Sequence, residues 1–553
     1  MSTISHRDLK KEIEKYLSFM AESFPVMCAS DEFIFFPRAE GSFRFPGAME
    51  DLSPGLIEEG IARSRNVLAF LEKLSLEKDI DLDLETDAWL LRMHAKNYLR
   101  TFETERLHFY DPSLYFMVAT QGLVMAAGDL SALASRLDRA ARLFRCAERQ
   151  LVSASTQRME QGLVWSANFT GFLDELAQSL SQRKKPGNTL SGKLNALHDQ
   201  AVSLGRRLKR LELSAGPECL GKRRYAELAE DAFGLKKDPQ ELYEILLDER
   251  TLLLEKLQVS AVSLGKEPSG WRLLAADPPL PHPKRKSPVD WYQAELDHLV
   301  RWLAESPGAS DINTRIVPEV RPMPGYLRGL RAFASYSACA GRRRQGIFFI
   351  GSDSASGSLS ARLAAHADYR YITVHETFPG HHHLDTVRKG LKSPIRRQSE
   401  NALFYEGWAC WAEQRMVDSG YFHRPEELMC ILRRRLQRCV RSICELGLHL
   451  GHLDDARAAE LLKGIDLEGG PATQLIRQYR CQPGYQLTYT IGRLELEKLV
   501  KKFRPLAQGD GEFYRLMLSA GEIPFDLLER HLERHLLRSN NIAEPGPGKS
   551  STC

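Results

Sequence analysis

Apolar residues recur every three or four positions from about residue 7 to residue 303 of the chain. On a helix this spacing gathers the apolar side chains on one face, which can then pack against a neighbour. Turn-forming residues separate the helical stretches, and no fixed repeat length of the solenoid kind is present. We therefore predict a mainly α fold. The clearest helical stretches are Leu90–Phe102, Leu130–Leu151, Leu190–Leu213 and Pro239–Leu257.

Proline-rich segments and one strand-like run divide the chain. Residues 275–288 are rich in proline and charge, which is typical of an exposed link, so we set a boundary there. The prediction is a helical N-terminal lobe over residues 1–288 and a second, catalytic lobe over residues 289–538. The β-branched and aromatic run Gly346–Gly351 predicts a strand. Residues 539–553 are polar and contain Pro-Gly-Pro-Gly, which predicts a disordered tail.

Charge and composition exclude several classes of protein. The 76 basic and 72 acidic side chains leave a net charge of +4 over 553 residues, too little to predict a nucleic-acid partner. No apolar run approaches the roughly 18 residues of a membrane-spanning helix, and no secretion signal is recognisable. We therefore expect a cytoplasmic protein that binds neither nucleic acid nor membrane. The 10 cysteines form no C-x-x-C pair, which argues against a disulfide scaffold or a zinc ribbon.

The segment His375–His383 concentrates four histidines and a glutamate within nine residues. A histidine followed by glutamate, with another histidine one or two helical turns later, is typical of zinc peptidases, in which imidazoles hold the ion and the glutamate activates water. The usual form is H-E-x-x-H, but Pro379 occupies the fourth position after His375. The Pro-Gly pair permits the helix to break there, so that either His381 or His382 lies beside His375.

A carboxylate on a following helix is the third ligand expected for zinc peptidases of the glutamate class. Glu406 lies among apolar residues in the stretch Asn401–Glu413. A buried carboxylate requires a cation or hydrogen bonds. A metal ion would satisfy Glu406, and an ion pair with a nearby arginine is the alternative. Glu413 and Asp385 are expected to be structural or to support the ligands.

Four sequence blocks resemble one bacterial family, the domain of unknown function 885, whose members are regarded as metallopeptidases with an H-E-x-x-P-G-H-H signature. The segment His375–His382 matches that signature, and Glu406–Ala409 matches the E-G-W-A block of the family. Gly447–His449 and Pro483–Gly492 are similar to two further blocks. The resemblance is strongest from about Val317 to Val500.

The resemblance implies a fold and a metal site. The family is distantly similar to thimet oligopeptidase and carboxypeptidase Taq, which implies a large helical peptidase of the gluzincin type, with a deep cleft and a small β-sheet near the metal. In those oligopeptidases the second histidine and the glutamate ligand have the separation found here between His381 and Glu406, 25 positions. This favours one Zn²⁺ ion held by His375, His381 and Glu406.

The catalytic residues follow from the same resemblance. Glu376 is expected to act as general base. Tyr489 is the first choice as hydrogen-bond donor to the oxyanion, and Tyr485 or His449 are alternatives. Two positions depart from the family pattern: Tyr485 stands where the family usually has glutamine, and Glu445 stands where it usually has aspartate.

Substrate contacts are expected from three places. The resemblance implies that the strand around Phe349, shortly before the metal-binding segment, is an edge strand that pairs with an extended peptide. His382 is expected to contact substrate, and Arg441 or Arg438 is a candidate for binding a terminal carboxylate.

These predictions favour a zinc-dependent metallopeptidase that hydrolyses small or extended peptides. Two alternatives stay open: a zinc hydrolase of a non-peptide amide or amino-acid conjugate, and a helical protein that binds metal without catalysis. The presence of Glu376 argues against the second alternative, because loss of catalysis would most simply remove the general base. Manganese or cobalt would suit the same ligands. Nothing in the sequence indicates an oligomeric state.

Overall fold

The computed structural model describes residues 6–75, 81–181, 188–214, 219–272, 287–324, 327, 334–338, 345–351, 368–465 and 470–540. Most of these residues lie in α-helices, so the predicted mainly α fold is confirmed. None of the described helices combines the length and apolar character that crossing a bilayer requires. The predicted link over residues 275–288 and tail over residues 539–553 lie almost entirely outside the described residues.

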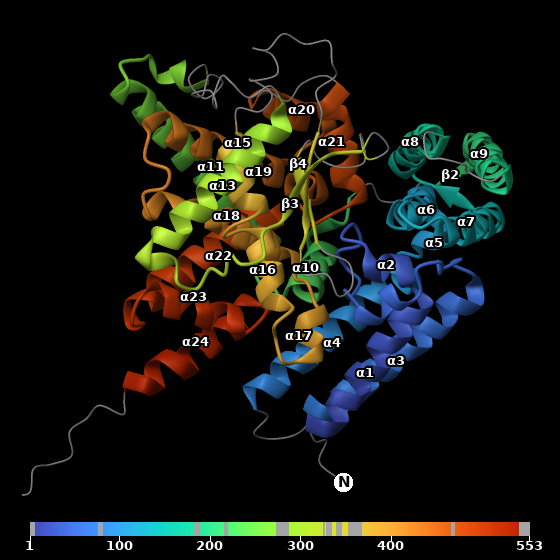
Figure 1. Cartoon of the computed structure of the whole chain (residues 1–553), viewed down its shortest axis with the longest axis horizontal. Helices are drawn as coiled ribbons and strands as arrows, with labels where there is room; N and C mark the ends of the chain where they lie inside the picture. The colour runs from blue at the N-terminus through green and yellow to red at the C-terminus, as the bar shows by residue number, and fades with distance from the viewer. Residues whose placement is uncertain are drawn as a thin grey trace, which may run out of the picture.

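The helices up to α9 form one group, drawn in blue to teal in Figure 1. α6, α7, α8 and α9 pack on one another, and α1, α3 and α4 pack together beside them around one apolar cluster. The short strands β1 and β2 pair in parallel within this group. The bounds are α1 His6–Ser23, α2 Pro25–Ala29, η1 Glu40–Arg44, α3 Pro54–Ser75, α4 Leu82–Leu99, η2 Arg100–Thr104, α5 Leu107–Tyr110, α6 Pro112–Ala126, α7 Leu130–Gln150, β1 Ser153–Ala154, α8 Thr156–Ser181, α9 Asn188–Leu208 and β2 Glu212–Leu213.

The elements from α10 onward form a second group, drawn in green to red in Figure 1. α11 packs along α19, and α18 packs along α22. The bounds are α10 Gly221–Phe233, α11 Pro239–Ser263, η3 Pro268–Gly270, α13 Pro288–Glu305, η4 Pro307–Ala309, β3 Glu319–Pro322, β4 Ala334–Ser337, β5 Ile347–Ile350, α15 Tyr369–Glu376, α16 His381–Arg388, α17 Pro394–Gln398, α18 Ala402–Asp418, α19 Pro425–Leu450, α20 Asp455–Lys463, α21 Gly470–Cys481, α22 Leu487–Phe503, η6 Arg504–Leu506, α23 Asp510–Ser519 and α24 Phe525–Asn540.

The packing assigns residues 219–272 to the second group, whereas the predicted boundary near residue 288 assigned them to the first. α10 and α11 lie among the C-terminal helices in Figure 1 and share a second apolar cluster with α19, α21 and α22. The first cluster also takes in side chains of α18, α22 and α23, so the two groups share a core. Periodicity reveals that a helix has an apolar face but not which helix covers it, so these packing groups do not follow from the sequence.

A three-stranded sheet has the order β3-β5-β4, with β5 parallel to β3 and antiparallel to β4. The strand predicted at Gly346–Gly351 is confirmed as β5, but its predicted place at the edge of the sheet is wrong. Phe349 pairs with Arg321 on one side and Ser335 on the other, so β5 is central and cannot pair with a further strand. β4 lies at one edge of the described sheet and contacts α15.

Candidate metal centre

The chain breaks sharply between α15 and α16. The Gly380 amide donates to the carbonyl of Val374 at 3.2 Å. A Cβ atom at Gly380 would lie 1.9 Å from the carbonyl oxygen of His375, so only glycine fits this position. The rings of His375 and His381 consequently meet edge to face, with centroids 4.7 Å apart. The helix breaks where the sequence predicted, and His381 rather than His382 lies beside His375.

Glu406 reaches the same point because α18 and α22 touch through two glycines. A Cβ atom on Gly407 would lie 2.5 Å from the carbonyl carbon of Gly492, and one on Gly492 would lie 2.1 Å from a backbone oxygen of α18. Larger residues would force these helices apart. The indole of Trp408 donates to the carbonyl of Pro379 at 2.8 Å, which fastens α18 to the break before α16.

Three buried side chains converge here. One nitrogen each of His375 and His381 and one oxygen of Glu406 all lie within 4.8 Å of one another. Glu406 Oε2 is 3.6 Å from His375 Nε2 and 3.5 Å from His381 Nε2, and it is buried without a hydrogen bond. A buried carboxylate oxygen that faces two imidazole nitrogens fits a cation. Two imidazoles and one carboxylate are also a ligand set of catalytic zinc sites, so these residues fit the expected Zn²⁺ ion.

The surroundings keep the Glu406 carboxylate ionised. Burial by itself raises the pKa of Glu406, but the imidazoles of His375 and His381 outweigh it and hold that pKa well below its ordinary value. Burial and the charge of Arg438 lower the pKa of His375, but Glu406 and Glu413 together raise it above its ordinary value. The group therefore combines a charged oxygen with two imidazoles in a buried site.

Glu413 orients the first histidine. It lies two helical turns after Glu406 on α18, and its Oε1 is 3.1 Å from His375 Nδ1. Arg438 Nη1 donates to both oxygens of Glu413, at 2.9 and 3.0 Å. Burial raises the pKa of Glu413, but Arg438 and His375 lower it to about 2. The charged Glu413 favours a proton on His375 Nδ1, which Arg438 Nη2 also approaches to 3.3 Å, and Nε2 is the nitrogen that faces Glu406 and is placed to bind a metal ion. The role of Arg438 was not found from the sequence.

Two tyrosines extend from the third ligand. The Tyr485 hydroxyl donates to Glu406 Oε1 at 2.8 Å, and the Tyr489 hydroxyl donates to that of Tyr485 at 3.4 Å. Burial and the charge of Glu406 raise the pKa of both tyrosines, so both stay neutral donors. Arg438 and Arg441 each lie 5.7 Å from the centroid of the Tyr489 ring. Tyr485 thus holds Glu406 directly, Tyr489 reaches the metal group through Tyr485, and Arg441 lies against the Tyr489 ring.

The expected general base contacts the edge strand β4. Glu376 Oε2 accepts a hydrogen bond from the backbone amide of Tyr336 at 2.9 Å. His382 is fully buried, with Nδ1 3.2 Å from the Tyr336 hydroxyl and Nε2 2.6 Å from the carbonyl of Ile316. Both ring nitrogens are therefore used inside the fold, and His382 anchors β4 instead of facing substrate as expected. Tyr336 was missed from the sequence because nothing local connects it to Glu376.

His449 is not brought to the metal group. Its Nε2 lies 2.9 Å from the carbonyl of Tyr479, and its Nδ1 accepts the amide of Leu220 at 3.4 Å. Burial lowers the pKa of His449 to about 4, so the ring is neutral at physiological pH. The expected oxyanion role of His449 is therefore replaced by a structural one that joins α19 to the segments before α10 and at the end of α21.

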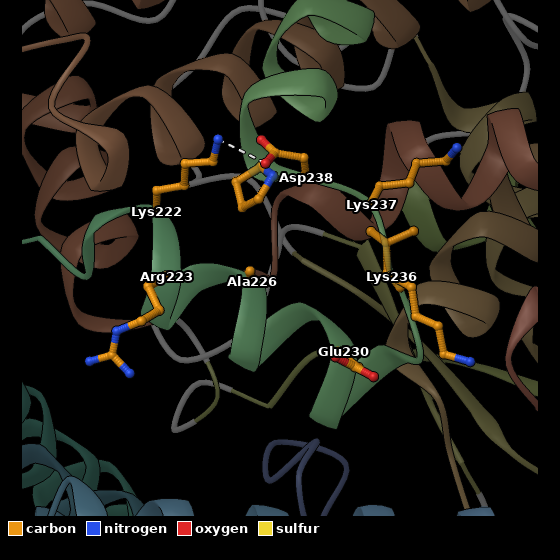
Figure 2. Close-up of a pocket in the computed structure, with 9 residues that line it drawn as sticks. Lys222, Arg223, Ala226, Glu230, Lys236, Lys237 and Asp238 are labelled. Atoms are coloured by element: carbon orange, nitrogen blue, oxygen red, sulfur yellow. Dashed lines mark ion pairs between the residues drawn. The ribbon is translucent and has the colours of Figure 1, made fainter.

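A surface hollow of about 510 Å³ lies around the start of α10 and the loop before α11, and shares no residue with the metal group. Figure 2 shows its basic side chains and the ion pair between Lys222 and Asp238. The other cations in the hollow also face carboxylates: Arg223 faces Glu227, Lys236 faces Asp526 and Lys237 faces Glu241. The hollow therefore has no uncompensated charge to attract an anion.

Solved structures with a similar fold change one expectation. A protein described as "a putative lipoprotein of unknown function from Shewanella oneidensis" matches with a TM-score of 0.71 and 15% identity, over 95% of this chain and 99% of its own. "The putative lipoprotein from Colwellia psychrerythraea" matches with a TM-score of 0.64 and 16% identity, over 96% and 99%. The prediction of a cytoplasmic protein is contradicted by these neighbours. It rested on the lack of an apolar span, and a lipid anchor needs no such span.

Sequence comparison gives the family directly. No curated protein matches the chain. The family described as "Bacterial protein of unknown function (DUF885)" matches over residues 39–532, which extends the resemblance well beyond the stretch Val317–Val500 in which it is strongest by motif. The match covers both groups of helices, including the segments that carry His375, His381 and Glu406. The chain belongs to the DUF885 family.

Proposed function

We propose that this protein is a zinc-dependent peptidase whose metal ion is bound by His375, His381 and Glu406. The observation that carries the proposal is the approach of three buried ligand atoms to within 4.8 Å of one another. The unpartnered Glu406 Oε2 between the two imidazoles supports it further. Zn²⁺ bound there would polarise a substrate carbonyl and make water nucleophilic at neutral pH.

Glu376 is the proposed general base and acid. Its carboxylate takes a proton from the attacking water and later gives it to the leaving amine, so that no net proton is consumed at Glu376. The hydrogen bond from the Tyr336 amide holds the carboxylate beside the edge of the sheet. That bond fixes one carboxylate oxygen and leaves the other for the water.

The tyrosines have separate proposed roles. Tyr485 keeps Glu406 oriented, because its hydroxyl donates to the Oε1 atom and turns Oε2 toward the histidines. Tyr489 is the proposed donor to the developing oxyanion. Among the described residues its hydroxyl bonds only to Tyr485, over a long distance of 3.4 Å, and it can exchange this bond for a stronger one to a charged oxygen.

β4 replaces β5 as the proposed strand for an extended substrate. β4 is an edge of the described sheet, and the Tyr336 amide points away from β5 toward Glu376. An extended peptide laid along this edge would run past the base and the metal group. Phe349, in the central strand, has no backbone group free for such pairing.

The proposal is tested by measuring bound metal and peptide hydrolysis on the same preparation. Protein purified without chelator is expected to hold one zinc ion and to cleave members of a mixed peptide library. Glu376→Gln is expected to keep the zinc and to lose a factor of roughly 10²–10⁴ in kcat. Glu460→Gln, at an exposed position of α20, is the matched control and should behave as wild type.

Each part of the proposal has its own contradicting result. Absence of metal from folded protein that has been offered zinc would refute the site. Bound zinc without cleavage of any peptide would refute the peptidase and favour a hydrolase of another amide. Full activity in Glu376→Gln would refute the role of the base.

A further inference from the structure

A cavity of about 360 Å³ lies beside the metal group and between the two groups of helices. One of its lining residues is Tyr485, whose hydroxyl donates to Glu406. Another is Asp31, which accepts a hydrogen bond from the Ser337 hydroxyl of β4 at 3.2 Å. The residue before Ser337 is Tyr336, whose amide donates to the proposed base. The cavity wall is thus joined to a metal ligand on one side and to the edge strand on the other.

The first group of helices gives this cavity an apolar wall. Six large apolar side chains that line it are only half-buried, and all six come from the N-terminal 165 residues. Leaving apolar surface in contact with water costs about 25 cal/mol for each Å². Apolar surface gathered in a cavity of this size is typical of a ligand-binding site. The six residues are Ile34, Phe35, Leu107, Met117, Val164 and Trp165.

The second group of helices gives the cavity an uncharged polar wall. Gln474, Gln478 and Gln482 line it together with Tyr485. Carboxamides donate and accept hydrogen bonds without a charge, which suits the amide groups of a peptide backbone.

Two of the carboxylates that line the cavity are compensated within the protein. Asp111 is 2.5 Å from Arg158 Nη1, and Glu105 is 3.8 Å from Arg100 and 3.9 Å from Arg158. These ion pairs reduce the field that the two carboxylates exert on an occupant. These two carboxylates therefore leave the apolar wall available to a neutral side chain.

We propose that this cavity receives a large aromatic or aliphatic side chain of the substrate. The inference rests on the proposed peptidase function and deepens it, because it names the substrate class: peptides with a bulky apolar residue close to the bond that is cut. The N-terminal helices then select the side chain, while the C-terminal helices hold the metal ligands and the base. Tyr485 connects the cavity to the metal group, because it lines the cavity and its hydroxyl orients Glu406.

Binding of two neutral tripeptides tests the cavity apart from the chemistry. Ala-Phe-Ala and Ala-Gly-Ala, each acetylated and amidated, are titrated by calorimetry into zinc-loaded Glu376→Gln protein and into metal-free wild-type protein. The phenylalanine peptide is expected to bind about ten- to a hundredfold more tightly, as burial of one aromatic side chain provides. Equal affinity for the two peptides would overturn the proposal, whatever the catalytic activity.

Two matched variants test whether the preference for the phenylalanine peptide arises in this cavity. Val164→Trp fills the cavity and is expected to abolish the preference for phenylalanine, while Val259→Trp makes the same change on the exposed face of α11 and should keep it. Trp165→Ala, which removes part of the apolar wall, is the second test if Val164→Trp does not fold. Preference for phenylalanine retained in both cavity variants would overturn the assignment.

Two results separate this proposal from the proposed function. Tight binding of the phenylalanine peptide without hydrolysis by the wild-type protein would refute the peptidase alone. Hydrolysis of peptides without any side-chain preference would refute the cavity alone.

Discussion

Replacing Glu413 by glutamine should weaken zinc binding although Glu413 is not itself a ligand. The variant keeps the shape and one oxygen of the side chain but removes the negative charge that faces His375 Nδ1 and favours a proton there. Loss of such a partner typically lowers metal affinity by about ten- to a hundredfold, or roughly 1.4 to 2.8 kcal/mol. The Arg438 side chain is only 8% exposed, and Glu413 is its only carboxylate partner among the described residues. Arg438 would therefore be left buried without a counter-charge. We therefore expect the free energy of unfolding to fall by about 3 to 5 kcal/mol as well.

Zinc affinity is measured by competition with a chromophoric chelator, at a temperature where urea titration finds the variant fully folded. Glu249→Gln is the matched control, because Glu249 also pairs with a buried arginine, Arg493, but contacts none of the three ligands. The control should lose stability without a change in zinc affinity. Wild-type zinc affinity in Glu413→Gln, or an equal loss in both variants, would refute the argument that Glu413 acts through His375.

Three further predictions concern the tyrosines, the helix crossing and pH. Tyr489→Phe should lower kcat about 10²–10³-fold with zinc content unchanged, and an unaltered kcat would exclude Tyr489 as oxyanion donor. Gly492→Ala should destabilise the fold by at least about 1 to 3 kcal/mol in urea titration, because its Cβ would lie 2.1 Å from a backbone oxygen; an unchanged midpoint would refute the close crossing. Burial raises the folded pKa of Glu522 to about 8, above its ordinary 4.5, so its contribution is complete below pH 4.5 and is lost as pH rises through about 8. Glu522→Gln should flatten that decline in unfolding free energy, and an unchanged pH profile would contradict it.

The parts of the site that the sequence predicted are those that local chemistry determines. Pro379 and Gly380 interrupt a helix wherever they occur, so a break between His375 and His381 follows from the residues alone. The apolar neighbours of Glu406 likewise indicate that its carboxylate is buried. The mainly α fold rests on a period of 3.6 residues and the strand at β5 on a β-branched and aromatic run between glycines, and both signals are also local.

The parts that sequence reasoning missed depend on contacts between distant segments. Arg438 meets Glu413 only because α19 packs beside α18, and a row of arginines on a helix gives no sign of which one is buried. The edge position expected for β5 came from the resemblance to peptidases, and the sequence could not correct it because the order of strands in a sheet is set by contacts between distant segments. His449 has the residue type of a catalytic group, yet two backbone partners from other segments decide its role.

The compensation of buried carboxylates separates Glu406 from every other buried acid among the described residues. Most of these acids face an arginine, which explains their burial by folding alone: Asp111, Glu295, Asp385, Glu400, Glu413, Glu427 and Glu522. Glu50 and Glu445 accept backbone amides instead. Glu406 has neither kind of partner, only a tyrosine on one oxygen and two imidazoles facing the other. The groups nearest to the unpaired Oε2 of Glu406 are two imidazole nitrogens, and a cation bound between them would supply the charge compensation that arginines supply to most of the other buried acids.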